Sequence, residues 1–248
     1  MLLAADIGNT NVVFGLYSEG QWQEVWRIDT KDEAQGKLYH SLNKHVKEPG
    51  EIKDIVISSV VPFFTPILTK QLQQKFGVTP YIIGPQSYPH LPLEILRPEQ
   101  IGTDLVADAT AAYHKFNGDC MVVDFGTALT FIIIANKKIK GVNIAPGLKT
   151  AMKALAGNAV KLQEIPLKLP DSVIGTDTTT AIQSGILWGY VGLVEKMIER
   201  IEKELSTELK VVATGGLSKV LEPLHDQFDA VEPNLTLDGM RLIYEAVK

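Results

Sequence analysis

Two short segments of this 248-residue chain combine a carboxylate, a glycine and a threonine between apolar runs. The first is DIGNTN at residues 6–11, and the second is DFGTA at residues 124–128. Each predicts a strand, a tight turn and a second strand, with the carboxylate and hydroxyl displayed beside backbone amides that glycine leaves uncovered. Amides and hydroxyls bind phosphate oxygens, and carboxylates hold hydrated Mg²⁺. The repeat therefore predicts two similar halves that together bind a phosphate group.

A third glycine-rich turn, Thr214-Gly215-Gly216, follows a strand pattern at 209–213. A single Asp-x-Gly triplet is typical of a simple turn, so either copy alone favours a structural role. Two matching copies and the third turn together favour a nucleotide site. The sequence has neither the G-x-x-x-x-G-K-[ST] loop nor the G-x-G-x-x-G fingerprint, and its histidines form no H-E-x-x-H pattern.

Composition and charge narrow the class of protein. The net charge of −5 argues against an intrinsic nucleic-acid binder, since such proteins usually carry a basic face. The single cysteine, Cys120, excludes an internal disulfide framework and favours a reducing compartment. The sequence shows no signal-like segment and no run of about 18 apolar residues. We therefore expect a cytoplasmic protein with no nucleic-acid or membrane partner.

The apolar patterns predict the same order of elements in both halves. Each half begins with an antiparallel meander, expected at 2–6, 11–17 and 22–28 and again at 121–125, 128–135 and 138–144. Further strands are expected at 54–58, 81–83 and 209–213, and helices near 34–46, 64–76, 103–115, 148–157, 176–205 and 238–246. The turn at Asn117-Gly118 predicts a boundary between a first half, 1–117, and a second half, 118–248.

This order resembles the ribonuclease-H-like unit, and its duplication is similar to the actin, Hsp70 and sugar-kinase superfamily. The resemblance implies an α/β fold of two mixed sheets flanked by helices, with ATP in the cleft between the halves. The third glycine-rich turn would lie beside the adenosine.

The motifs together resemble those of the type III pantothenate kinase family over essentially the full chain. The matching segments are DIGNTN (6–11), DFGTALT (124–130), GVNIAPG (141–147), IGTDTTTAIQSG (174–185), TGG (214–216) and LTLDG (235–239). The resemblance implies transfer of the γ-phosphate of ATP to the primary hydroxyl of pantothenate. The product would be 4'-phosphopantothenate, the first intermediate of coenzyme A biosynthesis.

The resemblance also assigns roles to individual residues. The family's general base is the Asp of a Gly-Ala-Asp-Arg motif, which falls here on Asp104. A helix N-terminus there would keep this carboxylate ionised, although a simple capping role is the structural alternative. The expected ATP-binding residues are Asp6, Ile7, Gly8, Asn9, Thr10, Asn11, Val12, Val13, Thr127, Gly215 and Gly216, and the expected substrate-binding residues are Gly102, Thr103, Asp104, Leu105 and Thr178. Asp6 would hold Mg²⁺ through water, and Asp124 would bind a monovalent cation, K⁺ or NH₄⁺.

Several departures from the family pattern lie on the acceptor side. The family's Arg is Leu105 here, a substrate-contacting Tyr is Ile95, a second glycine is Val142, and an expected Thr is Ala159. Arg97 could supply the missing charge, although a solvent-exposed loop Arg is the simpler interpretation. Two classes of function therefore stay open. One is a pantothenate kinase with an altered acceptor pocket, and the other is a divergent nucleotide-binding relative that uses another acceptor or acts as a regulatory accessory factor.

The long helix expected at 176–205 contains Gly185, Gly189 and Gly192, small residues that allow another helix to approach closely. An apolar stripe at 191–205 follows them, and packing of that stripe on its own sheet is the alternative to an interface. The resemblance implies a homodimer whose acceptor pocket is completed by the partner subunit. The expected partners are thus ATP, pantothenate and a second copy of the chain.

Overall fold

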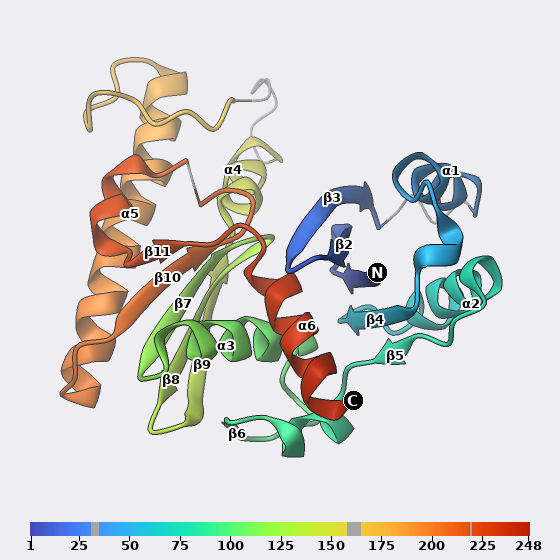
Figure 1. Ribbon diagram of the computed structural model, residues 1–248. Coiled ribbons are helices and arrows are strands. Elements are labelled where there is room, and N and C mark those ends of the chain that lie inside the picture. Colours follow the sequence, from blue (N-terminus) through green and yellow to red (C-terminus); the bar gives the residue numbers. More distant parts are fainter. Residues whose placement is uncertain (31–34, 158–164, 219) are drawn as a thin grey trace. The chain divides into compact units, whose positions relative to one another are not determined.

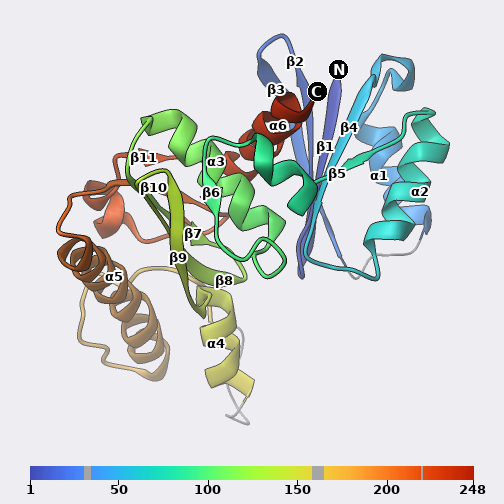
Figure 2. The ribbon, with the colours of Figure 1, turned by 90° about the horizontal axis from the view of Figure 1, so that it is seen from below.

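The computed structural model describes residues 1–30, 35–157, 165–218 and 220–248. Contacts divide the chain into two compact units, one formed by Met1–His114 with Leu235–Lys248 and the other by Lys115–Asn234. Each unit holds a mixed sheet with helices packed against it (Figures 1 and 2). No helix in the described ranges is long and apolar enough to cross a bilayer. Ala159, one of the acceptor-side departures, lies outside the described residues.

The sheet of the first unit has the strand order β3-β2-β1-β4-β5. Its strands are β1 (Leu2–Ile7), β2 (Asn11–Ser18), β3 (Gln21–Asp29), β4 (Asp54–Ser59) and β5 (Tyr81–Ile82). Strand β1 pairs antiparallel with β2 and parallel with β4, which places Asp6 between Val13 and Ser58. The β2–β3 turn has positive φ at Glu19 (52°) and Gly20 (79°), as a tight two-residue hairpin requires.

Helices α1 (Gln35–His45) and α2 (Thr65–Phe76) cover one face of this sheet (Figure 2). Their buried leucines share a core with alternate β1 residues such as Leu3 and Ile7, because successive strand side chains point to opposite faces. The Pro-rich connection that follows β5 contains a 3₁₀ helix (Pro85–His90) and the short strand β6 (Glu94–Ile95). It leads into α3 (Thr103–Phe116), whose first turn carries Asp104.

The sheet of the second unit repeats the first. The strands that this unit contributes are β7 (Cys120–Phe125), β8 (Ala128–Ala135), β9 (Lys138–Pro146), β10 (Lys210–Thr214) and β11 (Ala230–Val231). They run in the order β11-β10-β7-β8-β9, which is the order of the first sheet when β7 stands for β1. Thr214 on β10 lies opposite Asp124 on β7, just as Ser58 lies opposite Asp6. The predicted duplicated fold of two mixed sheets is confirmed.

Helices α4 (Leu148–Gly157) and α5 (Thr178–Leu205) pack on the second sheet. The apolar stripe of α5 is buried at Val191, Val194 and Ile198, as spacings of three and four predict. These side chains share a core with β7 and β8. The stripe therefore packs on its own sheet, which was the alternative to an interface.

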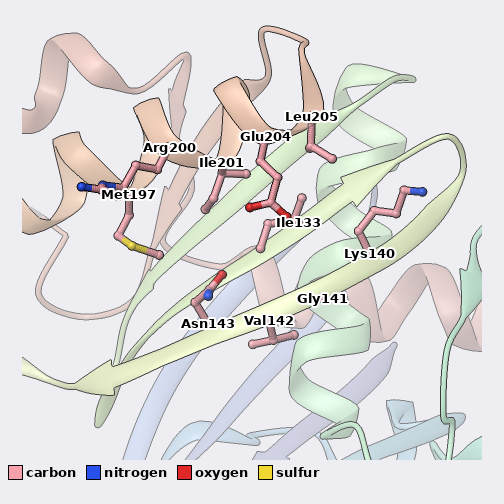
Figure 3. Close-up of a pocket in the computed structure, with 10 residues that line it drawn as sticks. All are labelled: Ile133, Lys140, Gly141, Val142, Asn143, Met197, Arg200, Ile201, Glu204 and Leu205. Carbon is pink, nitrogen blue, oxygen red and sulfur yellow. The ribbon is translucent and has the colours of Figure 1, made fainter.

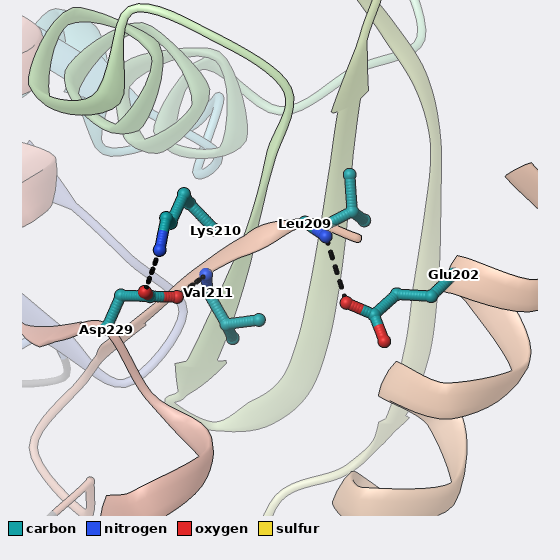
Figure 4. Close-up of polar contacts among 5 residues, drawn as sticks. All are labelled: Glu202, Leu209, Lys210, Val211 and Asp229. Atoms are coloured by element: carbon teal, nitrogen blue, oxygen red, sulfur yellow. Dashed lines mark hydrogen bonds and ion pairs between the residues drawn. The ribbon is translucent and has the colours of Figure 1, made fainter. Parts of the chain in front are cut away.

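Two carboxylates fix the start of β10 (Figure 4). Glu202 of α5 accepts a hydrogen bond from the backbone N–H of Leu209 at 2.9 Å. Asp229 accepts one from the backbone N–H of Val211 at 2.8 Å and one from Lys210 Nζ at 2.6 Å. The strand so anchored ends at Thr214, directly before the glycine-rich turn at 215–216.

The last helix departs from the predicted division. The predicted second half, 118–248, includes α6 (Leu235–Val247), but this helix packs with the first unit and contacts β1 and β4. Thr236 donates a hydrogen bond to the buried Asp108 carboxylate of α3 at 2.8 Å. The first boundary also falls between His114 and Lys115 rather than after 117. The order of elements along the chain does not predict that α6 packs with the first unit, because only tertiary contacts determine where it packs.

Candidate active site

Short hydrogen bonds hold the turn after β1. The backbone N–H of Gly8 donates to the Asn11 carbonyl at 3.0 Å, and the Thr30 hydroxyl donates to the Gly8 carbonyl at 2.7 Å. Asn9, Thr10 and Asn11 are exposed at this turn. Their position suits the phosphate contact expected from the sequence.

Not every residue of the first motif can contact a nucleotide through its side chain. The side chains of Ile7 and Val12 are fully buried in the core of the first unit, and Val13 is half-buried. Ile7 and Val12 could therefore reach a ligand only through their backbone groups.

Asp6 is joined to the start of α3 through two hydroxyls. Ser58 Oγ donates a hydrogen bond to Asp6 Oδ1 at 2.9 Å. Ser58 Oγ also lies 2.9 Å from Thr103 Oγ1. The backbone N–H of Ser59 donates to Thr103 Oγ1 at 3.0 Å. Ser58 is completely buried. The structure thus links the predicted magnesium-binding carboxylate to the residue that precedes the predicted base.

Asp104 occupies the first turn of α3 and is half-buried. Burial raises the pKa of its carboxyl above the ordinary value, while hydrogen bonds from the backbone N–H groups of Leu105 and of Asp104 itself oppose that change. The bond from Leu105 to Asp104 Oδ1 is 2.8 Å long. The effect of the helix N-terminus expected from the sequence is therefore present, but burial outweighs it. A raised pKa makes this carboxylate a stronger base than an exposed aspartate.

The position of the Asp104 carboxylate leaves no room for a side chain at Gly102. A β-carbon at position 102 would lie 2.4 Å from Asp104 Oδ1, well inside van der Waals contact. The backbone O of Gly102 also accepts the Val106 N–H at 3.2 Å, which starts the helix. Leu105, at the position of the family's Arg, is half-buried.

Sequence reasoning missed Tyr88, which lies in the 3₁₀ helix Pro85–His90. Its side chain is buried, and its hydroxyl has no hydrogen-bond partner among the described residues. Burial raises the pKa of Tyr88 to about 12, and the negative charges of Asp104 and Glu99 act in the same direction. Buried hydroxyls nearly always have a partner, so an unpaired one within the electrostatic reach of a candidate base suits a ligand contact. An aromatic residue in a Pro-rich segment gave no sequence signal of this role.

The second carboxylate, Asp124, is enclosed by glycines of its own unit. A β-carbon at Gly215 would lie 2.4 Å from Asp124 Oδ1, and one at Gly126 would lie 3.1 Å from Oδ2. Gly215 also has a left-handed φ of 87°, which glycine adopts without strain. The structure therefore brings together Asp124 and the glycine-rich turn at 215–216, as one nucleotide-binding edge would require.

Thr127 is exposed at the second turn, and its carbonyl is held from two sides. The Gly147 N–H donates to it at 3.1 Å, and the Thr150 hydroxyl donates to it at 2.9 Å. A β-carbon at Gly147 would lie 2.5 Å from this carbonyl oxygen. The glycine that ends the 141–147 segment is thus needed to close the turn.

Thr178 is the exposed first residue of α5. Asp177 caps the helix by accepting the Thr180 N–H at 3.0 Å, and hydrogen bonds from Thr180 hold the pKa of the Asp177 carboxyl below its ordinary value. A β-carbon at Gly175 would lie 2.3 Å from the Ala181 Cα, so this glycine permits the entry of the chain into the helix. Much of the 174–185 motif therefore serves the helix start that presents Thr178.

The other acceptor-side departures are clearly placed. Ile95 is half-buried in β6, and Arg97 is exposed with a positive φ of 53°. Burial and backbone hydrogen bonds account for the pKa of Asp104 among the described residues, with no contribution from a cationic side chain.

The donors suit the cations that the resemblance implies. The described residues contain no group of three or more His, Cys, Asp or Glu side chains that could hold a metal ion. Mg²⁺ in phosphoryl-transfer sites is commonly held by one or two carboxylates together with water and substrate phosphates. A single carboxylate such as Asp6 or Asp124 fits that mode of binding.

A pocket of about 420 Å³ lies elsewhere, between β9 and α5 of the second unit. Figure 3 shows Lys140 and Arg200 extending toward opposite ends of it, over an apolar floor that includes Ile133 and Ile201. Its charged groups do not converge on one point. Val142, where the family has a second glycine, lines it together with Gly141 and Asn143, but none of the expected ATP-binding, substrate-binding or metal-binding residues does.

Comparison with known proteins identifies relatives along the whole chain. The family described as type III pantothenate kinase matches residues 2–200. Two proteins named type III pantothenate kinase, from Citrifermentans bemidjiense and from Geobacter sp. strain M21, are each 38% identical over 255 residues. Each alignment covers 100% of both chains.

Solved structures support the fold independently. A Baf family transcriptional activator from Campylobacter jejuni aligns with a TM-score of 0.60 at 21% identity, covering 98% of this chain and 97% of that one. MreB 5 of Spiroplasma citri, bound to AMPPNP, aligns with a TM-score of 0.57 at 10% identity, covering 99% and 96%. At these identities the likeness concerns the fold alone. The family match and the full-length relatives carry the assignment: the chain belongs to the type III pantothenate kinase family.

Proposed function

We propose that this protein transfers the γ-phosphoryl group of ATP to the primary hydroxyl of pantothenate, forming 4'-phosphopantothenate for coenzyme A biosynthesis, with Asp104 as general base. The observation that carries this proposal is the half-buried Asp104 carboxylate at the start of α3, in a chain of this family. Its raised pKa favours acceptance of the hydroxyl proton as the new P–O bond forms.

The nucleotide side uses both Asp-x-Gly turns. The amides and hydroxyls at 8–11 and Thr127 would bind phosphate oxygens, and the turn at Gly215-Gly216 would accept the adenosine. Asp6 would hold Mg²⁺ through water and Asp124 a monovalent cation, K⁺ or NH₄⁺. Phosphoryl transfer depends mainly on positioning and charge neutralisation, so Asp6→Ala should impair turnover even where ATP still binds.

On the acceptor side, Tyr88 would take the place of the tyrosine lost at Ile95. Its buried, unpaired hydroxyl can donate a hydrogen bond to the acceptor next to Asp104. We propose no other residue to replace the positive charge that is lost at Leu105. We therefore expect the acceptor pocket to bind pantothenate through neutral hydrogen bonds and apolar contacts, and Gly102, Thr103 and Thr178 to complete it.

The second candidate is a relative that phosphorylates another acceptor. Leu105 favours it, because an apolar side chain replaces the cation that would meet the acceptor's carboxylate. Retention of Asp104 argues against a purely regulatory accessory factor, since such a protein has no need of a base at this point.

One assay separates these functions. ADP release is coupled to NADH oxidation with and without pantothenate, in the presence of Mg²⁺ and K⁺. The proposal predicts release that depends on pantothenate. ADP release only with a different alcohol would support the second candidate, and no release with any acceptor would support an accessory role.

A homodimer is the proposed assembly, and the exposed glycines of α5 support it. A β-carbon at Gly185, Gly189 or Gly192 would meet nothing within 4 Å outside the helix, so no packing against the described residues requires glycine at these positions. Light scattering at micromolar concentration should give twice the chain mass. A monomeric mass would contradict the proposal. We place the protein in the cytoplasm, in keeping with its single buried thiol, Cys120.

A further inference from the structure

The hydrogen bond between Ser58 and Asp6 has a fixed direction. An ionised carboxylate only accepts, so the Ser58 hydroxyl proton is donated to Asp6 Oδ1. The Ser58 oxygen is then the nearer of two acceptors for the Thr103 hydroxyl proton, at 2.9 Å against 3.3 Å for the Ser59 carbonyl. Thr103 Oγ1 itself accepts from the Ser59 N–H. The result is a chain from a backbone N–H through two hydroxyls to a carboxylate. In such a chain each bond polarises and strengthens the next.

The duplicated fold provides an internal comparison for this arrangement. Thr214 holds the place of Ser58 in the second sheet, opposite Asp124. Its hydroxyl instead donates to the Glu232 carbonyl at 2.7 Å, across to the segment after β11. The hydroxyl bond to the carboxylate is therefore not a consequence of strand register. It is a feature of the first unit, where the start of α3 lies beside β4.

We propose that Ser58 is a positioning residue for phosphoryl transfer, because its hydroxyl fixes the Asp6 carboxylate relative to the helix start that carries Asp104. This inference rests on the proposed roles of Asp6 and Asp104. Ser58 contacts neither nucleotide nor acceptor. It acts through Asp6 on one side and through Thr103 on the other.

The buried position makes this link rigid. Ser58 is 0% exposed and lies at the end of β4, which pairs with β1 from Leu2 to Ile7. Without the hydroxyl, Asp6 Oδ1 loses this donor, and Thr103 Oγ1 loses its contact with Ser58 and keeps only the longer bond to the Ser59 carbonyl, at 3.3 Å, for its proton. The carboxylate then loses one of the contacts that orient it, and small displacements in phosphoryl-transfer sites lower turnover strongly.

The test compares Ser58→Ala with Thr110→Val. Thr110, farther along α3, is a matched control because it is also buried and its hydroxyl bonds the Val106 carbonyl, at 2.7 Å, and no other group in the described part of the chain. In steady-state assays of the full chain, kcat of Ser58→Ala should fall about 10- to 100-fold, while KM for pantothenate changes less than about threefold. The Mg²⁺ concentration for half-maximal activity should rise. Thr110→Val should keep both values.

The melting temperature of each variant separates positioning from folding. A similar small decrease in both variants, with loss of kcat in Ser58→Ala alone, supports the inference. Normal kcat and Mg²⁺ dependence in Ser58→Ala, or equal loss in both variants, overturns it. An unmodified protein that releases no ADP with pantothenate would instead overturn the proposed function, so the two failures are distinguishable.

Discussion

Gly239 of α6 lies so close to Ala107 of α3 that a β-carbon at position 239 would stand 1.8 Å from the Ala107 carbonyl oxygen. The closeness of these two backbones, together with the bond from Thr236 to Asp108, holds the C-terminal helix against the helix that carries the candidate base.

Gly239→Ala should therefore force α6 away from α3. Overpacking of this kind costs about 1–3 kcal/mol, so the melting temperature should fall by several degrees. Gly118→Ala is the control, because its β-carbon would meet nothing closer than 3.7 Å. Thermal unfolding followed by circular dichroism measures both. Equal melting temperatures for the two variants would show that α6 does not pack as described.

Much of the fold could be predicted because its signals are local. The apolar runs and turn residues around Asp6 and Asp124 define hairpins without reference to the rest of the chain, and the predicted strands agree with the structure to within one or two residues. The place of α6 could not be predicted, since it depends on a contact between Gly239 and a helix far away in sequence. Strands β6 and β11 were not predicted, since each is only two residues long and neither stands out as an apolar run as Tyr81-Ile82-Ile83 does.

The site residues that belong to sequence motifs could be predicted, and those that act through tertiary packing could not. The DIGNTN and Gly-Thr-Asp segments gave Asp6 and Asp104 directly. Ser58 gave only a weak signal, a pair of serines at the end of an apolar strand. The burial that raises the pKa of Asp104 was not predictable, because burial is set by tertiary packing and not by the local sequence.

Leu105→Arg should strengthen pantothenate use. A charge-assisted contact to a carboxylate contributes about 1.5–3 kcal/mol, so KM for pantothenate should fall roughly 10-fold or more. Leu105→Met is the matched control, because it keeps an apolar side chain without charge. Steady-state kinetics measure both variants. A gain that Leu105→Met shares, or no gain in either variant, would contradict a role for the missing cation.

Tyr88→Phe should have two opposite effects. Removing a buried, unpaired hydroxyl should raise the melting temperature of the free protein slightly, while KM for pantothenate should rise about 3- to 10-fold if that hydroxyl binds the acceptor. Tyr81→Phe is the control, since the Tyr81 hydroxyl already bonds Ser87 Oγ at 2.9 Å. That change should lower the melting temperature and leave KM unaltered. An unchanged KM in Tyr88→Phe would remove Tyr88 from the acceptor site.

The pH dependence follows from the direction of the Asp104 shift. Because burial raises its pKa above 3.8, the carboxylate gains a proton at a higher pH than an ordinary aspartate does. The acidic limb of kcat/KM should therefore lie above that value, and activity should fall as the pH decreases through it. Leu105→Arg places a cation nearby, so it should move this limb to lower pH. A pH–rate profile of both proteins checks the shift, and coincident profiles would contradict it.

Asp104→Asn tests the central claim most directly. Asparagine keeps an oxygen for the Leu105 N–H but cannot take up the hydroxyl proton, so pantothenate-dependent ADP release should fall about 10²- to 10⁴-fold. ATP binding, measured by titration calorimetry, should remain, and the melting temperature near neutral pH should rise because a buried charge is removed. Turnover near that of the unmodified protein, with the fold and ATP binding intact, would contradict Asp104 as the base.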